Sequence, residues 1–175
     1  MISILYVFWM YVILFGVIGW LRGWVKELIV AFSVITALAA NTLLRQYLPI
    51  VTNLDIKSSE LFWIRVSILA ALAFFGYQTV GVVPHLASKA TRERVQEALF
   101  GMVLGAFNGY LIAGTILFYI DQAGYPFPDV ISKPTGNLVA AIQTLMTFMP
   151  PRWLGVPWVY AAPIICLIFI VVVYI

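Results

Sequence analysis

The chain has 175 residues, of which 63% are hydrophobic and 10% are charged. Soluble domains carry about 25% charged residues, so a soluble fold of this composition would lack the polar surface needed to cover itself. The formal net charge of +3 is too small to indicate nucleic-acid binding, and no basic stripe interleaved with aromatic residues is present. We therefore expect an integral membrane protein that is surrounded by the lipid bilayer and has no nucleic-acid partner.

Long runs without a charged residue dominate the chain. They are 1–21, 28–44, 66–84, 98–120 and 153–175. A hydrocarbon core needs about 20 helical residues, and uninterrupted runs of this length favour helices over the shorter alternating strands of a barrel. The runs predict an all-α integral membrane protein with four to five transmembrane helices. In the last run, Pro157 suits a helix start and Pro163 is expected to kink the helix.

A short amphipathic helix is predicted between the fourth and fifth runs. Leu138, Ile142, Leu145 and Met149 recur with a helical period between Thr135 and Met149, within a segment bounded by prolines. We expect this helix to lie on the outer membrane surface or to dip into it. The predicted organisation is a four-helix membrane domain (1–121), an extracytoplasmic loop with the amphipathic helix (122–152), and a fifth transmembrane helix (153–175).

The junctions between the runs carry the orientation signal. Arg22 and Lys26 lie in the first junction, and Lys89, Arg92 and Arg94 lie in the third. Both junctions are short and rich in basic residues, whereas the second and fourth junctions are longer and have fewer basic residues for their length. Because Lys and Arg favour the cytoplasmic side, we place the first and third junctions in the cytoplasm and the N-terminus outside.

Glycines form two stripes at helical spacing. The first stripe is Gly16, Gly19 and Gly23, and the second stripe is Gly101, Gly105 and Gly109. Small residues let membrane helices approach closely, so we expect both stripes to be helix-packing surfaces and to pair with each other. The sequence leaves open whether the packing lies within one chain or involves a partner.

Polar residues within the runs are few. Asn41, Gln78 and Asn108 are expected to form interhelical hydrogen bonds, and Arg65 is expected to extend to the membrane interface. No ionisable residue stands well inside a run, which argues against a pump, a proton-coupled transporter or a channel with a charged filter. A neutral pore stays possible.

Candidate catalytic and metal-binding residues are absent from the sequence. His85 could in principle ligate a pigment or a haem iron, but an interfacial histidine is the simpler interpretation, and Cys166 is a lone thiol in an apolar run. No catalytic or metal-binding motif is present. We therefore predict no enzyme activity, no metal site and no cofactor, and residues for a bound pigment, quinone or lipid stay unknown.

Two segments carry a family resemblance. They are 16–28, with the sequence GVIGWLRGWVKEL, and 99–109, with the sequence LFGMVLGAFNG. The first, followed by a small-residue helix, resembles the opening of the colicin V production protein (CvpA) family, and the second resembles the glycine-patterned fourth helix of that family. The resemblance covers about residues 1–121. It implies a bacterial inner-membrane protein linked to envelope processes, with no catalytic residues to carry over.

Three functional hypotheses follow from these observations. The first is a non-enzymatic multi-pass inner-membrane protein that acts in the cell envelope through helix–helix packing, with a membrane protein or a second copy as its partner. The second is an accessory subunit of a larger respiratory or photosynthetic membrane complex. The third is a small transporter or channel.

Overall fold

The computed structural model describes residues 4–79, 94–127, 131 and 133–174, and these residues form helices joined by short turns, with no β-strand among them. The helices are α1 (Ile4–Arg22), α2 (Trp24–Tyr47), α3 (Pro49–Thr52), α4 (Ser59–Thr79), α5 (Arg94–Gln122), α6 (Asn137–Thr147), α7 (Pro150–Trp153) and α8 (Trp158–Tyr174). The prediction of an all-α membrane fold is confirmed.

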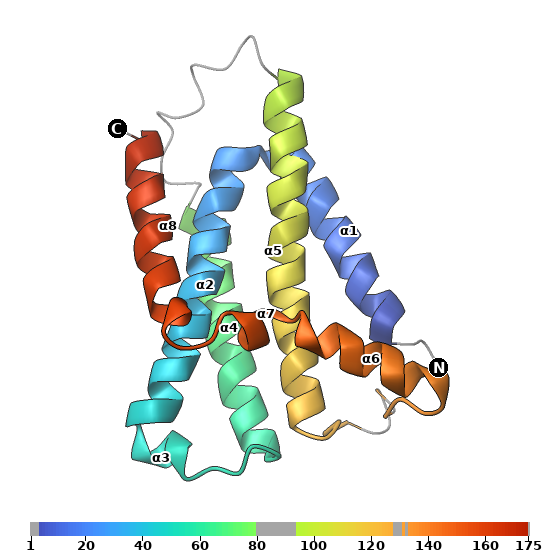
Figure 1. The fold of residues 1–175 in the computed structure, drawn as a ribbon. Helices are drawn as coiled ribbons and strands as arrows, with labels where there is room; N and C mark the ends of the chain where they lie inside the picture. Colours follow the sequence, from blue (N-terminus) through green and yellow to red (C-terminus); the bar gives the residue numbers. More distant parts are fainter. Residues whose placement is uncertain (1–3, 80–93, 128–130, 132, 175) are drawn as a thin grey trace.

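Four helices, α1, α2, α4 and α5, are long and apolar enough to cross a membrane, judged by length and composition. They form an antiparallel bundle in which α1 packs most extensively on α5, and α2 packs on α4, α5 and α8 (Figure 1). The α1–α2 turn, the last turn of α4 and the first turn of α5 all lie towards the same end of the bundle, which we name the Gly23 end (Figure 1). The opposite end, where α3 joins α2 to α4, is the α3 end (Figure 1).

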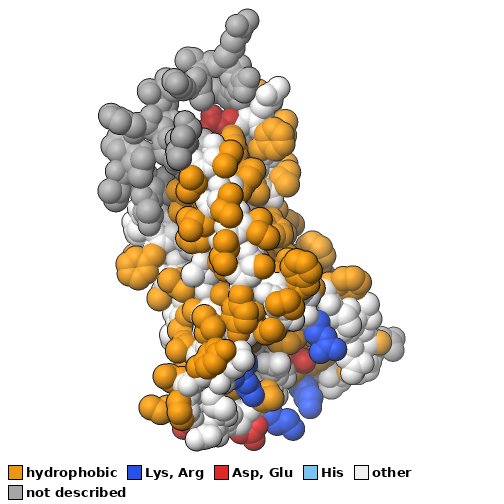
Figure 2. Space-filling model, turned by 60° about the vertical axis from the view of Figure 1, so that its left-hand side comes forward, with side chains coloured by type: hydrophobic (Ala, Val, Ile, Leu, Met, Phe, Trp, Pro, Cys, Tyr) orange, Lys and Arg blue, Asp and Glu red, His pale blue; other side chains and the backbone are white. Residues whose placement is uncertain are grey.

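The surface of the bundle divides along its length. On the face shown in Figure 2, hydrophobic side chains cover the middle of the molecule, and Lys and Arg side chains gather towards the α3 end. Large apolar residues of α8, including Ile164, Ile168 and Phe169, are more than half exposed or close to it. Such exposure suits a lipid environment, in which an apolar outer face carries no hydration cost.

The core is built from apolar residues that face each other across the long helices. Val34 of α2, Leu69 of α4 and Leu111 of α5 are essentially inaccessible and belong to one cluster. Phe8 and Leu117 pack with α6, and Leu38 of α2 packs with Val159 of α8. α6, α7 and α8 therefore pack against the long helices α1, α2 and α5.

The predicted amphipathic helix is shorter than the periodic segment and lies across the bundle beside α1 and α5 (Figure 1). Ile142, Met146 and Met149 are buried, whereas Leu138 is 43% exposed. Of the predicted apolar face, Ile142, Leu145 and Met149 pack in one cluster with Phe8 and Leu117, and Leu138 does not.

The fifth apolar run is not one continuous helix. Its first residue, Trp153, belongs to α7, and α8 begins at Trp158 after a turn and has 17 residues. The residue before a proline avoids helical geometry, so Pro157 separates the two helices. The span predicted for 153–175 is therefore wrong at its start, while Pro163 does lie inside α8.

Candidate functional site

The two glycine stripes face each other in the structure. A Cβ atom on Gly19 would collide with the carbonyl oxygen of Gly101 and would lie 2.8 Å from Cα of Gly105. A Cβ on Gly109 would lie 2.8 Å from Cβ of Phe15 on α1. At these positions the backbones of α1 and α5 touch, which residues with a side chain would prevent.

The positions within the stripes are not equivalent. A Cβ on Gly16 would lie 3.4 Å from Cβ of Ala106, an ordinary contact, so this glycine has room for an alanine. Gly23 ends α1 with a φ of 85°, a conformation that favours glycine, and lies against the Glu97 side chain. This break in the helix turns the chain so that Arg22 and the first turn of α2 lie beside each other.

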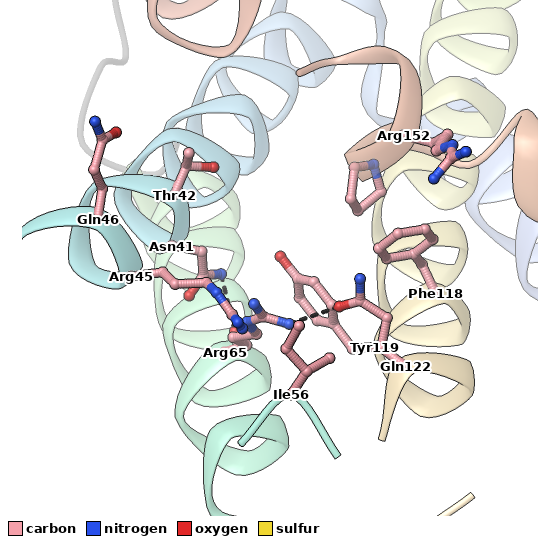
Figure 3. Close-up of a pocket in the computed structure, with 11 residues that line it drawn as sticks. Asn41, Thr42, Arg45, Gln46, Ile56, Arg65, Phe118, Tyr119, Gln122 and Arg152 are labelled. Carbon is pink, nitrogen blue, oxygen red and sulfur yellow. Dashed lines mark hydrogen bonds between the residues drawn. The ribbon is translucent and has the colours of Figure 1, made fainter. Parts of the chain in front are cut away.

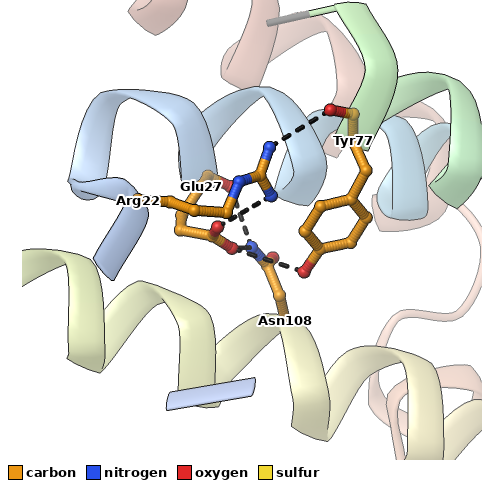
Figure 4. Close-up of polar contacts among 4 residues, drawn as sticks. All are labelled: Arg22, Glu27, Tyr77 and Asn108. Carbon is orange, nitrogen blue, oxygen red and sulfur yellow. Dashed lines mark hydrogen bonds and ion pairs between the residues drawn. The ribbon is translucent and has the colours of Figure 1, made fainter. Parts of the chain in front are cut away.

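A buried polar cluster lies where this turn meets α4 and α5 (Figure 4). Glu27, in the first turn of α2, has no exposed side-chain surface. Its Oε1 accepts a hydrogen bond from Nη1 of Arg22 at 3.1 Å, and its Oε2 accepts one from Nδ2 of Asn108 at 2.8 Å. The Tyr77 hydroxyl lies 3.5 Å from the same Oε2. Both carboxylate oxygens are thus partnered by the protein itself.

The other groups of the cluster are also cross-linked. Arg22 donates from Nη2 to the carbonyl oxygen of Tyr77 at 3.2 Å, and its guanidinium stacks 4.3 Å from the centre of the Tyr77 ring. Asn108 donates from Nδ2 to the carbonyl oxygen of Glu27 at 2.9 Å. The cluster therefore joins α1, α2, α4 and α5 at the Gly23 end. A carboxylate in the first turn of a helix is further stabilised by the positive end of the helix dipole.

The match to known families decides the identity of the chain. A family model described as colicin V production protein matches residues 5–133. The chain belongs to this family. Searches of curated proteins and of solved structures returned no significant match. With its four apolar helices, this member of the colicin V production protein family is a multi-pass membrane protein.

The family match extends beyond the predicted resemblance, which ended near residue 121. Both glycine stripes and the whole polar cluster lie inside the matched segment, whereas α6, α7 and α8 lie outside it. In this member of the colicin V production family, the segment outside the match, from α6 onward, packs against the matched helices.

The residues predicted to set the orientation differ in their burial and pairing. Arg22 is half-buried and ion-paired, whereas Lys26 is exposed. Arg94 is the first residue of α5, and Lys89 and Arg92 lie outside the described residues, as does His85. In the described part of the chain, no group of three His, Cys, Asp or Glu residues is placed to hold a metal ion.

Sequence reasoning missed the burial of Glu27, because this residue stands beside an apolar run and not inside one. The sequence did contain one indication of this burial, because Arg22 and Glu27 carry opposite charges on either side of the turn glycine Gly23. Of the polar residues predicted to bond between helices, Asn108 and Asn41 do so, and Gln78 is exposed. Arg65 donates to Gln122, the last residue of α5.

Proposed function

We propose that the protein is a non-enzymatic component of the bacterial inner membrane that acts in the cell envelope through packing of its helices, with a membrane protein or a second copy as partner. The observation that carries the proposal is the backbone contact between α1 and α5, closed at one end by the Glu27 cluster. This arrangement holds four helices in one rigid geometry.

The chemistry of the cluster supports a structural role. A general acid or base must reach the proton of a substrate, with its reacting atom free to form that hydrogen bond. Both oxygens of Glu27 instead accept hydrogen bonds from side chains of the bundle, and the residue has no exposed surface. A carboxylate held in this way stabilises a fold rather than presenting itself to a ligand.

The lipid around the helices determines which forces can hold them together. Lipid tails are as apolar as the helix surfaces, so helices in a membrane are held by close packing and by interhelical hydrogen bonds. The glycine stripes supply the close packing, and the Glu27 cluster supplies the interhelical hydrogen bonds. Because both lie in the family-matched segment, we expect this rigid core to be the part of the molecule that serves the family's envelope role.

The test compares alanine at two glycines of the same helix. Gly19→Ala places a methyl group against the α5 backbone, whereas Gly16→Ala meets only an ordinary contact. In cells that lack the protein, envelope permeability is measured by dye uptake after each variant is expressed at an equal membrane level. Wild type and Gly16→Ala should restore the barrier, and Gly19→Ala should not. Full restoration by Gly19→Ala, with unchanged oligomeric state and thermal stability, would refute the proposal.

Purification in a mild detergent separates the other hypotheses. A homogeneous particle built from this chain supports the proposal. Comigration with a coloured or redox-active complex would favour an accessory subunit. Substrate flux in liposomes that is abolished by changing Asn108 would favour a transporter.

A further inference from the structure

A cavity of about 700 Å³ opens at the α3 end of the bundle, among α2, α4, α5 and α7. Arg45 of α2, Arg65 of α4 and Arg152 of α7 all line it, and Figure 3 shows Arg45 and Arg65 close together, with Arg152 apart from them beyond Phe118. No Asp or Glu is among the lining residues in the part of the chain that the structure describes. Three separate helices thus bring positive charge to one concave site.

Among the residues that the structure describes, these arginines have no acidic partner within 4.0 Å. The ion pair that the described residues do form, with its nitrogen and oxygen within 4.0 Å, is Arg22–Glu27 at the other end of the bundle. Nη1 of Arg65 donates to the neutral Oε1 of Gln122 at 2.8 Å. Nη1 of Arg45 is buried and has no hydrogen-bond partner among the described residues.

The arrangement is electrostatically unfavourable by itself. Arg45 and Arg65 are near enough to repel each other, and their guanidinium groups point into the same space (Figure 3). The buried Nη1 of Arg45 has lost hydration that no described residue replaces, whereas the Arg65 guanidinium lies 4.9 Å from the centre of the Tyr119 ring. An anion between the arginines would remove both costs, and the planar guanidinium fork matches the oxygens of a phosphate group.

A second unpartnered polar atom lies at the same cavity. Asn41 is 5% exposed, donates from Nδ2 to the carbonyl oxygen of Arg65 at 3.2 Å, and lines the cavity. Its Oδ1 is buried and accepts no hydrogen bond from a described residue. A ligand that carries a hydroxyl group beside its phosphate would satisfy this acceptor together with the arginines.

The position of the cavity indicates where such a ligand comes from. Arg45 lies in the last turn of α2 and Gln122 is the last residue of α5, so the cavity lies at the ends of membrane-spanning helices. Lipid headgroups lie at this level, and a basic pocket there attracts an anionic headgroup by charge. Phe118 and Ile56 add apolar surface to the lining.

We propose that this cavity is a binding site for a phosphate-bearing anion, supplied by the headgroup of an anionic glycerophospholipid. The site lies apart from the glycine stripes and the Glu27 cluster, so it stands independently of the proposed role of helix packing.

The test measures binding to the purified full-length protein in a neutral detergent. Phosphatidylglycerol, phosphatidylcholine with the same acyl chains, and inorganic phosphate are titrated separately, with thermal stability and native mass spectrometry as readouts. Phosphatidylglycerol should bind wild type at least about tenfold more tightly than phosphatidylcholine does, because the zwitterionic headgroup brings its own cation. Stabilisation by inorganic phosphate as well would show that the phosphate alone is recognised, and stabilisation by the lipid alone would show that the headgroup is needed.

The variants distinguish the cavity from general surface charge. Arg45→Gln and Arg152→Gln should each weaken phosphatidylglycerol binding at least about tenfold, the size expected for loss of a charge-assisted hydrogen bond. Arg45→Lys keeps the charge but loses the fork, so it should restore binding only in part. Lys57→Gln is the matched control, since Lys57 is exposed at the same end and does not line the cavity.

Each variant is first checked for a wild-type melting temperature without added lipid. Arg152→Gln should disturb folding least, because Arg152 is exposed. Phosphatidylglycerol binding that is unchanged in Arg152→Gln and Arg45→Gln would overturn the proposal. An equal loss in Lys57→Gln would also overturn it, because binding would then follow net charge and not the cavity.

Discussion

Removing Arg22 should destabilise the bundle more than removing Glu27, although the two residues form one ion pair. Arg22→Gln leaves a carboxylate with no exposed surface and without its cation, whereas Glu27→Gln leaves an arginine whose side chain is 22% exposed and can reach water. Losing one partner of a buried pair costs about 3 to 5 kcal/mol. We expect the upper part of this range for Arg22→Gln and the lower part for Glu27→Gln.

The measurement is reversible unfolding in mixed micelles, titrated with a denaturing detergent and followed by circular dichroism. The double variant should cost about 2 kcal/mol less than the sum of the single variants, because the second change removes a charge that the first had left unpaired. Lys26→Gln is the control, since Lys26 is exposed in the same turn and its loss should change stability by less than about 0.5 kcal/mol. Additive single variants, or equal effects of Arg22→Gln and Lys26→Gln, would refute the reasoning.

Orientation and pH dependence provide two further predictions. Cysteines placed at Gln96 and Asn53, both exposed and at opposite ends of the bundle, are introduced into a Cys166→Ala background. If the Gly23 end is cytoplasmic, an impermeant reagent labels intact cells at position 53 only, and labelling at 96 instead would reverse the topology. Burial, together with the Asp121 carboxylate that its hydroxyl faces, raises the pKa of Tyr125 to about 12. The folded state therefore holds this proton more tightly than the unfolded state, so the stabilisation present below about pH 10 should be lost between about pH 10 and 12, and Tyr125→Phe should lack that loss. Identical high-pH unfolding of wild type and Tyr125→Phe would contradict this account.

The helices could be predicted from the sequence because hydrophobicity is a local property of the chain. The first four long apolar runs correspond to α1, α2, α4 and α5, and each of these helices extends past a charged end of its run, whereas the fifth run is divided between α7 and α8. α2 begins at Trp24, before the charged Lys26 and Glu27, and continues through Arg45. Charged residues are good helix formers, so the end of an uncharged run marks the membrane boundary rather than the end of the helix.

The polar sites could not be predicted in the same way. Arg45 and Arg65 stand at the two ends of the second junction and Arg152 stands at the end of the fourth, and nothing in their spacing indicates that they line one cavity. Asn108 binds a carboxylate 81 positions away. The glycine stripes were recognisable because their spacing repeats within a helix, yet the sequence did not show that Gly16 has room for a side chain and Gly19 has none.

The sequence by itself determined that this chain is a helical membrane protein and indicated its family, since composition, apolar run length and short motifs are read along the chain. The tertiary structure decided which charges are buried together. It paired Arg22 with Glu27 and left Nη1 of Arg45 without a hydrogen-bond partner among the described residues. The physical reason is that the energy of a charge depends on what lies within a few ångströms of it, and helix packing brings those neighbours from distant parts of the chain.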